Sequence, residues 1–431
     1  MLDLFHRTYG AIFRRYPVLW RMALVVLLGE IVFAAINNYA LSFYVVDDLG
    51  RPASLVGILV STFLIAEMLL KLPFGHLSDR HGRRRFAMYG LAVCTVGPAM
   101  VCALPTHLLV ASPILIYLVL MPLRVLDGAG AAALWPPLFA AVPDHVPTQE
   151  RAAAMSVMNT AYMAGLALGP TLAGVAMTVA RLAEAPEHWV GKAPFAMAAG
   201  VAALGALVAS RLPAAASVAA PHNGRPKLAV GNLRLVAIVI IITMGEMFAT
   251  STIAPYLALY VREVTGIHRS NVGFLLLLLF VPAGVLGIPI GHLSDRWPRR
   301  RVVQAALITS AVGLWLVPVC DSLWELIAVG VVVVIGFLFG LPSWLALISE
   351  LAPESGRGKT MGLMASAQGL GAFLGPLVGG RLWEINICYP WYAAAGALTL
   401  AAACSVLFIS GGRQAGLGVT KNCYRERGKT G

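Results

Sequence analysis

Long apolar stretches follow one another along almost the whole chain, from Arg21 to Ser410. A transmembrane helix needs about 20 mostly apolar residues, whereas transmembrane strands show segments of about ten residues of alternating polarity. The stretches here are long and continuous, and a helix satisfies its own backbone hydrogen bonds in lipid. The sequence therefore predicts an all-α membrane protein with twelve transmembrane helices. We assign these helices to residues 21–46, 54–76, 86–105, 110–141, 152–180, 194–212, 233–261, 270–291, 302–319, 323–349, 359–383 and 389–410.

The charges indicate which side of the membrane each loop occupies. Only 12% of the residues are charged, against about 25% in soluble domains. The net charge of +12 would suit a nucleic-acid partner, but the basic residues lie mainly in the two tails and in every second loop. This one-sided excess follows the positive-inside rule. We therefore expect a multi-pass protein of the cell (cytoplasmic or inner) membrane, with both termini in the cytoplasm, lipid headgroups at its basic loops and no nucleic-acid partner.

A duplicated motif divides the chain into two halves. The segment Gly75–Arg80 recurs as Gly291–Arg296, and an arginine triplet follows each copy. At the same offset Glu30 aligns with Glu246, so the first three spans of each half correspond without a gap. Because six spans return the chain to the same side, we predict two pseudo-symmetric six-helix bundles related by an axis along the membrane normal.

The predicted organisation has five segments. Residues 1–20 carry aromatic and arginine side chains but no apolar core or cleavage site, so they suggest an interfacial cytoplasmic segment and not a signal peptide. Residues 213–232 form the longest polar interruption. The expected segments are the N-terminal segment 1–20, the first bundle 21–212, the cytoplasmic linker 213–232, the second bundle 233–410 and the cytoplasmic tail 411–431.

Three motifs, in order, resemble those of the major facilitator superfamily. The residues that carry the resemblance are Gly75, Asp79, Arg80, Gly82 and Arg83 after span 2, Arg124, Asp127, Gly128 and Gly130 in span 4, and Gly165, Gly169, Pro170 and Gly174 in span 5. The second copy of the loop has Pro298 where the first has Gly82. The resemblance covers residues 21–410 and implies the major facilitator fold with transport by alternating access. Its span-5 motif is typical of the family's proton-coupled drug exporters and favours export by antiport.

The resemblance also implies a gating role for the duplicated loop. The residues concerned are Asp79, Arg80, Arg83, Asp295 and Arg296. A carboxylate at such a turn can cap a neighbouring helix N-terminus or pair with an arginine across the interface between the halves. Contacts that exist in one conformation only can set the balance of states. The alternative is a topological role, in which the arginines simply keep the loop in the cytoplasm.

Carboxyl groups within the spans are candidates for transport chemistry, because an intramembrane charge costs at least ~2.5 kcal/mol. Glu30 lies near the middle of span 1, and Asn37 follows seven residues later on the same helix face. Glu30 can carry a proton, hold a cationic substrate, or do both in competition; a purely structural hydrogen bond is the alternative. Its repeat partner Glu246 can serve the same cavity or be a remnant of the duplication.

Arg124 lies deep in span 4 and cannot deprotonate in a protein. It can drive proton release from a nearby carboxylate, and Asp127 three residues later is the simplest partner. An intrahelical structural pair is the alternative reading. The corresponding span of the second half, 326–349, contains no Lys or Arg, so we assign Arg124 to coupling. Glu67 and Lys71, four residues apart, are expected to form a structural ion pair.

Glycine and proline in spans 5 and 11 predict hinge or packing surfaces between the halves. Glycine allows close helix contact, and proline removes a backbone hydrogen bond and permits bending. The residues are Gly165, Gly169 and Pro170 in span 5 and Gly375 and Pro376 in span 11.

Together these patterns predict a monomeric secondary transporter that exports amphipathic small molecules in exchange for protons. The alternatives are an importer or facilitator of a metabolite, such as a sugar or organic anion, and a lipid flippase. Neither a receptor nor an enzyme is expected, because the sequence shows no large soluble domain and no nucleophile–base spacing. The six cysteines show no metal-ligand spacing, and no Walker-type phosphate loop is present, so we expect no metal and no cofactor.

Overall fold

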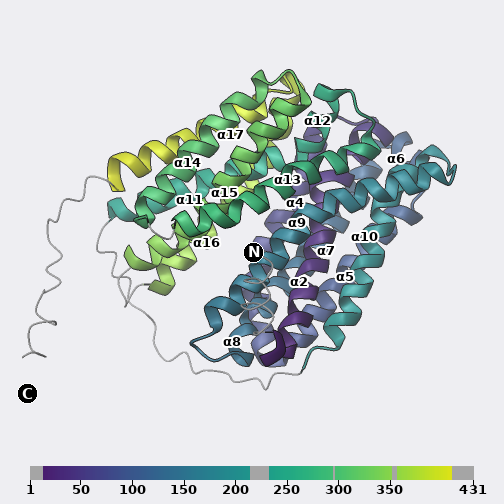
Figure 1. The fold of residues 1–431 in the computed structure, drawn as a ribbon. Helices are drawn as coiled ribbons and strands as arrows, with labels where there is room; N and C mark the ends of the chain where they lie inside the picture. The colour runs from purple at the N-terminus through teal and green to yellow at the C-terminus, as the bar shows by residue number, and fades with distance from the viewer. Residues whose placement is uncertain (1–12, 214–232, 295–296, 352–356, 410–431) are drawn as a thin grey trace, which may run out of the picture.

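The computed structural model describes residues 13–213, 233–294, 297–351 and 357–409. These residues form helices and their connections, with no strand among them. Eleven helices are long and apolar enough to cross a membrane, and α13 (Arg269–Ser294) contributes a further apolar helix over Arg269–Pro282. The predicted all-α, twelve-helix architecture is therefore confirmed (Figure 1).

Six membrane helices and two short ones form the first half. The first membrane helix runs over Pro17–Asp48 and combines α2 (Pro17–Ala35), a π-helical turn (Ile36–Ala40), α3 (Leu41–Phe43) and a second π-helical turn (Tyr44–Asp48). The others are α4 (Ala53–His81), α5 (Arg83–Ala103), α6 (Thr106–Ala111), α7 (Pro113–Ala140), α8 (Val142–His145), α9 (Arg151–Leu182) and α10 (Glu187–Ser210).

The second half repeats this order. A 3₁₀ turn at Ala254–Tyr256 joins its first two helices. The helices are α11 (Leu233–Ile253), α12 (Leu257–Thr265), α13, α14 (Arg299–Leu316), α15 (Leu323–Leu351), α16 (Arg357–Ile385) and α17 (Tyr389–Cys404).

Helix starts and ends follow local chemistry. The first membrane helix begins at Pro17, four residues before its predicted start, because proline is suited to the first helical turn. Between α4 and α5 the chain turns at Gly82, whose φ of 98° favours glycine. The sharp turn places the arginine triplet in the first turn of α5.

The halves pack on each other through two seams that the pseudo-symmetry relates. One seam joins α4 to α16, and the other joins α9 to α13. An added Cβ at Gly57 would lie 2.1 Å from the Pro376 carbonyl oxygen, and one at Gly273 would lie 2.5 Å from that of Pro170. Both seams are therefore closed by glycine facing a proline-containing helix.

Hydrogen bonds and ion pairs between the halves gather at one end of the molecule. This closed end consists of the last turns of the first membrane helix, α9 and α12 and the first turns of α4, α10 and α13. Arg262 and Arg269, for example, reach Asp47 and Asp48 there. Figure 1 shows the halves joined near α12 and α13 and their helices diverging toward the opposite end, where α8 lies. We call that opposite end the open end.

Candidate transport site

Glu30 lies on α2 with only 5% of its surface exposed. The contact with α9 is close, because an added Cβ at Gly165 would lie 2.6 Å from the Cβ of Glu30. Tyr162 of α9 and the Glu67 carboxylate of α4 interact electrostatically with Glu30. Within the described part of the chain, no basic group lies within 4.0 Å of the Glu30 carboxylate. Glu30 is thus a buried acid without a fixed counter-charge.

Aromatic rings form a row that reaches Glu30 through Tyr162. The ring centroids of Phe33 and Phe63 are 5.6 Å apart, and those of Phe33 and Trp135 are 5.7 Å apart. Trp135 continues the row, with its centroid 5.5 Å from that of Tyr162. Phe33 and Phe63 are buried, whereas Trp135 and Tyr162 are half-buried; aromatic faces of this kind can contact an apolar or ring-containing ligand. We call Phe33, Phe63, Trp135 and Tyr162 the aromatic wall.

Arg124 and Asp127 form a buried ion pair within α7, the intrahelical pair that stood as the alternative to a coupling role. Nη2 of Arg124 lies 2.6 Å from Oδ2 of Asp127, and the residues are 4% and 5% exposed. Nη1 of Arg124 also donates to Oδ1 of Asn37 at 3.3 Å. The guanidinium lies over the ring of Phe63, 5.3 Å from its centroid. The pair is therefore joined both to the first membrane helix and to the aromatic wall.

The hydrogen-bonding capacity of this pair is not exhausted. Nε of Arg124 and Oδ1 of Asp127 are both buried without a hydrogen-bond partner among the described residues. Gly97 of α5 leaves room for the acid, because an added Cβ there would lie 2.4 Å from Oδ1 of Asp127. A buried group with unused donors and acceptors can rearrange when its charge changes.

The second half places Glu246 separately, on α11. It is 3% exposed, and an added Cβ at Gly340 of α15 would lie 3.4 Å from its Oε1. Beside it the indole nitrogen of Trp344 donates to Oγ1 of Thr243 at 2.8 Å. Glu246 thus faces α15 of its own bundle, and no described basic group forms an ion pair with it.

The predicted pair of Glu67 and Lys71 is present, with Oε1 and Nζ 2.7 Å apart. Lys71 is the more exposed partner, at 48% of its side chain against 12% for Glu67. The pair belongs to α4, beside the site, and among the described residues no cation pairs with the Glu30 carboxyl.

The loop between α4 and α5 is held within the first half by Arg83. This side chain lies 3.0 Å from Oδ1 of Asp79 and 2.5 Å from Oδ2 of Asp144, and it also donates to the Ala140 carbonyl. Arg80 is exposed. The second copy of the loop cannot be compared, because Asp295 and Arg296 lie outside the described residues.

Among the predicted hinge residues, the glycines touch helices of their own half, whereas the carbonyls of Pro170 and Pro376 lie in the seams between the halves. An added Cβ at Gly169 would lie 2.7 Å from the Cβ of Ala34, so α9 lies directly against α2. At Gly375 it would lie 2.0 Å from Oγ of Ser251, so α16 lies equally close to α11. Pro170 and Pro376 are inside α9 and α16.

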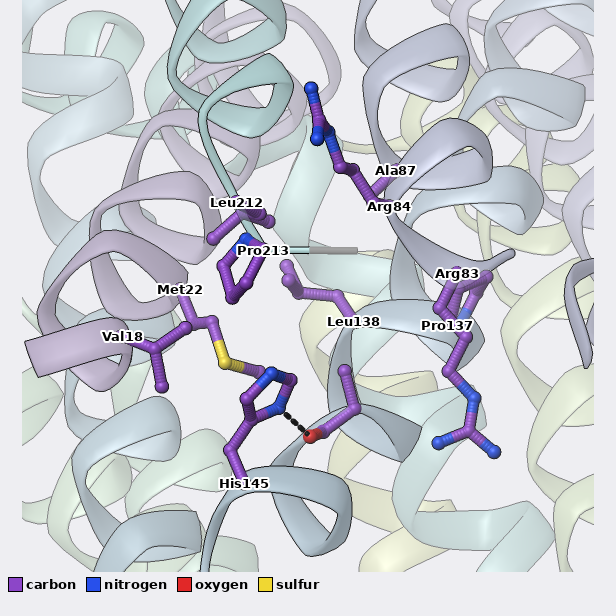
Figure 2. Close-up of a pocket in the computed structure, with 11 residues that line it drawn as sticks. Val18, Met22, Arg83, Arg84, Ala87, Pro137, Leu138, His145, Leu212 and Pro213 are labelled. Carbon is purple, nitrogen blue, oxygen red and sulfur yellow. Dashed lines mark hydrogen bonds between the residues drawn. The ribbon is translucent and has the colours of Figure 1, made fainter. Parts of the chain in front are cut away.

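A separate pocket lies at the open end of the first half (Figure 2). Its wall is mostly apolar, with two arginines and a histidine. The lining residues are Val18, Met22, Arg83, Arg84, Ala87, Pro137, Leu138, Ala141, His145, Leu212 and Pro213. Figure 2 shows His145 bonded through Nδ1 to the Ala141 carbonyl oxygen. Because none of Glu30, Asn37, Arg124, Asp127 or Glu246 lines this pocket, it is distinct from the transport site.

Sequence reasoning missed the charged network at the closed end. Arg269 is 7% exposed and lies 2.9 Å from Asp48 and 2.8 Å from Glu187. Arg262 lies 2.6 Å from Asp47. The available signal was the net charge of the short loops. The loop after span 1 is acidic, and the connection between spans 7 and 8 is basic.

Comparison with known proteins agrees with this architecture. The family described as the Major Facilitator Superfamily matches residues 22–238 and 239–416. Quinolone resistance protein NorA of Staphylococcus aureus (strain Mu50 / ATCC 700699) is 24% identical over 356 residues, covering 81% of this chain and 86% of that protein. Multidrug resistance protein 1 of Bacillus subtilis (strain 168) is 24% identical over 369 residues, covering 84% and 89%.

Solved structures share the fold. The D-xylose-proton symporter superposes with a TM-score of 0.73 at 16% identity, covering 90% of this chain and 97% of that one. The nucleoside transporter NupG gives 0.71 at 12% identity, covering 90% and 99%. These neighbours are membrane transporters and not enzymes. The chain, which resembles the drug-exporter branch, therefore belongs to the Major Facilitator Superfamily.

Proposed function

We propose that this transporter exports amphipathic small molecules in exchange for protons and acts as a monomer. The observation that carries the proposal is Glu30, a buried acid without a fixed counter-charge beside the aromatic wall. An apolar ligand body can lie on the rings while its cationic group meets the carboxylate. A proton and the ligand then compete for one acid.

The orientation follows from the positive-inside rule and places both termini in the cytoplasm. The closed end then faces outward, and the open end faces the cytoplasm. In this inward-open state Glu30 releases its proton to the cytoplasm and binds the ligand. After the halves rock to the outward-open state, a proton from outside protonates Glu30 and the ligand leaves.

Arg124 and Asp127 have a second role in this proposal. Arg124 keeps its charge, so a proton that reaches Asp127 removes the negative partner and leaves the arginine held by Asn37 and Phe63. The site thereby changes its contacts with the first membrane helix and α4 when a proton binds. Glu246 shapes the cavity from the second half.

The remaining assignments are proposals of the same kind. Asp79, Arg80, Arg83, Asp295 and Arg296 set the balance between inward-open and outward-open states. Helix contacts at the hinge residues permit the halves to rock. These contacts involve Gly165, Gly169, Pro170, Gly375 and Pro376. The division into 1–20, 21–212, 213–232, 233–410 and 411–431 belongs to the same proposal.

The relatives support export over uptake. NorA and Multidrug resistance protein 1 are named for resistance to quinolones and to multiple drugs, which suits an apolar site with one acid. A sugar or nucleoside site needs several free hydrogen-bonding groups, and Asn37, one of the few amides available, already accepts from Arg124.

The test is transport in proteoliposomes with an imposed pH gradient and a fluorescent lipophilic cation as the probe. We expect cation flux to follow the proton gradient in the wild type, and we expect the Glu30→Gln variant to lose this dependence. Glu150→Gln is the matched control, because Glu150 pairs with Arg15 in a partly exposed ion pair. Flux that ignores the gradient, or normal coupling in Glu30→Gln, would contradict the proposal.

A further inference from the structure

The first membrane helix contains a π-helical turn at Ile36–Ala40, between the transport site and the closed end. Within it the amide of Leu41 donates to the carbonyl of Ile36, five residues earlier. Such widened turns occur frequently at functional sites. This turn carries Asn37 and Tyr39, whose side chains bind to two different parts of the molecule.

Asn37 contacts the ion pair in α7. Its Oδ1 accepts from Arg124, whose other terminal nitrogen holds Asp127. The other titratable groups acting near this pair are Cys94 of α5 and Glu67 of α4. The pair is buried, and two of its polar atoms have no hydrogen-bond partner among the described residues. Loss of the Asp127 charge therefore changes the contacts of Arg124. Because Asn37 is bonded to Arg124, this change reaches the first membrane helix through Asn37.

Tyr39 contacts the other half. Its hydroxyl donates to the carbonyl of Arg269 and accepts from the amide of Gly273 at 3.3 Å. The residue is fully buried in the seam between α9 and α13, where an added Cβ at Gly174 would lie 3.1 Å from Oη. The side chain of the same Arg269 pairs with Asp48 and Glu187. Tyr39 is therefore bonded to the residue that fastens the closed end.

The pseudo-symmetry supplies a natural comparison. Tyr256 lies in the 3₁₀ turn of the second half, and its single hydroxyl proton is shared between the carbonyl oxygens of Ala53 at 3.3 Å and Pro376 at 3.0 Å. Tyr39 and Tyr256 thus each bind the first turn of a helix in the opposite half. The span of the second half that corresponds to α7, residues 326–349, has no arginine. Tyr256 therefore joins the halves without an arginine equivalent to Arg124 in its own half.

We propose that the π-helical turn is a coupling element, in which Asn37 and Tyr39 transmit the charge state of Asp127 to the contact between the first membrane helix and α13. When Asp127 is neutral, Arg124 and Asn37 shift, Tyr39 leaves α13 and the closed end opens. Tyr39 is a positioning residue, with two arrangements, bound to α13 or released from it. This inference rests on the proposed proton exchange, but its test needs no transport.

The test measures the distance between spin labels at His107 and Asp321 by pulsed electron spin resonance. Both positions are exposed, one in each half, and the labels are placed in a cysteine-free background that retains transport. The loss of the hydroxyl contacts between the halves, two in Tyr39→Phe and one in Tyr256→Phe, should raise the population with an open outer end at least about five-fold. Tyr44→Phe should leave it unchanged, because the Tyr44 hydroxyl has no hydrogen-bond partner among the described residues and its ring contacts Phe195 of the same half.

The decisive comparison adds Asp127→Asn to each background. We expect this change to open the outer end in the wild type and by the same factor in Tyr256→Phe, since independent sites act additively. In Tyr39→Phe and in Asn37→Leu its effect should fall to less than about two-fold, because the transmitting contact is missing. Equal effects in all four backgrounds, or none in the wild type, overturn the inference.

The same distances separate this inference from the proposed function. If Asp127→Asn acts through Tyr39 while proteoliposome flux ignores the pH gradient, the coupling element is real and proton exchange is wrong. If flux follows the gradient while Asp127→Asn acts equally in every background, proton exchange stands and the inference is wrong.

Discussion

Replacing Arg269 by methionine tests how strongly the closed end holds the halves together. Methionine keeps much of the length and apolar surface of the side chain but removes the guanidinium. The change removes the ion pairs with Asp48 at 2.9 Å, Glu187 at 2.8 Å and Asp47 at 3.7 Å. The Tyr39 hydroxyl keeps its acceptor, because it binds the backbone carbonyl of residue 269.

The contact with Asp48 dominates the expected effect. The Arg269 and Asp48 side chains are 8% and 9% exposed, and breaking a buried pair by removing one partner costs about 3–5 kcal/mol. Glu187 is 73% exposed, so its pair contributes about 1 kcal/mol at most. The unpaired Asp48 regains water only when the closed end opens, so the cost falls on the closed state. A difference of about 3 kcal/mol changes a population ratio more than 100-fold.

The assay is again the label distance between His107 and Asp321, with thermal unfolding measured in parallel. Arg262→Met is the matched control on the same surface, because Arg262 pairs with Asp47 at 2.6 Å but remains 22% exposed. We expect the control to shift the population about five-fold, for roughly 1 kcal/mol. An Arg269→Met shift no larger than that of Arg262→Met would refute the argument that burial sets the strength of this contact.

Three further predictions concern packing, pH and a buried hydrogen bond. Gly165→Val should abolish transport, because even its Cβ would lie 2.6 Å from that of Glu30, whereas Gly200→Ala, with nothing within 4 Å, should leave transport unchanged. Partial burial, followed by the charges of Arg181 and Arg269, lowers the pKa of His268; its contribution to stability is therefore complete above its unfolded pKa of about 6.5 and falls as the pH drops below it. The midpoint of thermal unfolding should then fall less between pH 8 and pH 5.5 in His268→Gln than in the wild type, and an equal fall would contradict this. Trp344→Phe should lose about 1 kcal/mol of unfolding free energy in denaturant titration, since it removes the hydrogen bond to Thr243; an unchanged midpoint would refute that.

The fold was predictable because its signals are local or periodic. Apolar length decides which segments span the membrane, and the duplicated loop decides how the halves correspond. The ion pairs of Arg124 with Asp127 and of Glu67 with Lys71 were predictable for the same reason, because side chains three or four residues apart meet on one helix face.

The contacts of the closed end were not predictable from local spacing. Asp48 and Arg269 are far apart in the chain and meet only after two bundles have folded and docked. The orientation of the chain in the membrane is enough to explain a charged residue at the end of a span. The sequence therefore does not distinguish a charge that joins the halves from a charge in a solvated loop. The Arg83 loop shows the same limit, since its partner Asp144 is on neither α4 nor α5.

The two tyrosine contacts show how structural symmetry escapes a sequence alignment. Arg269 and Ala53 correspond at the offset of the duplicated loop, and each offers its carbonyl to a tyrosine of the opposite half. The tyrosines themselves do not align, because Tyr39 corresponds to Pro255 and not to Tyr256. The different turns reconcile this one-residue shift: a widened π-helical turn carries Tyr39, and a tighter 3₁₀ turn carries Tyr256. Because only the π-helical turn also reaches Arg124, the same contact between halves can respond to charge on one side of the molecule alone.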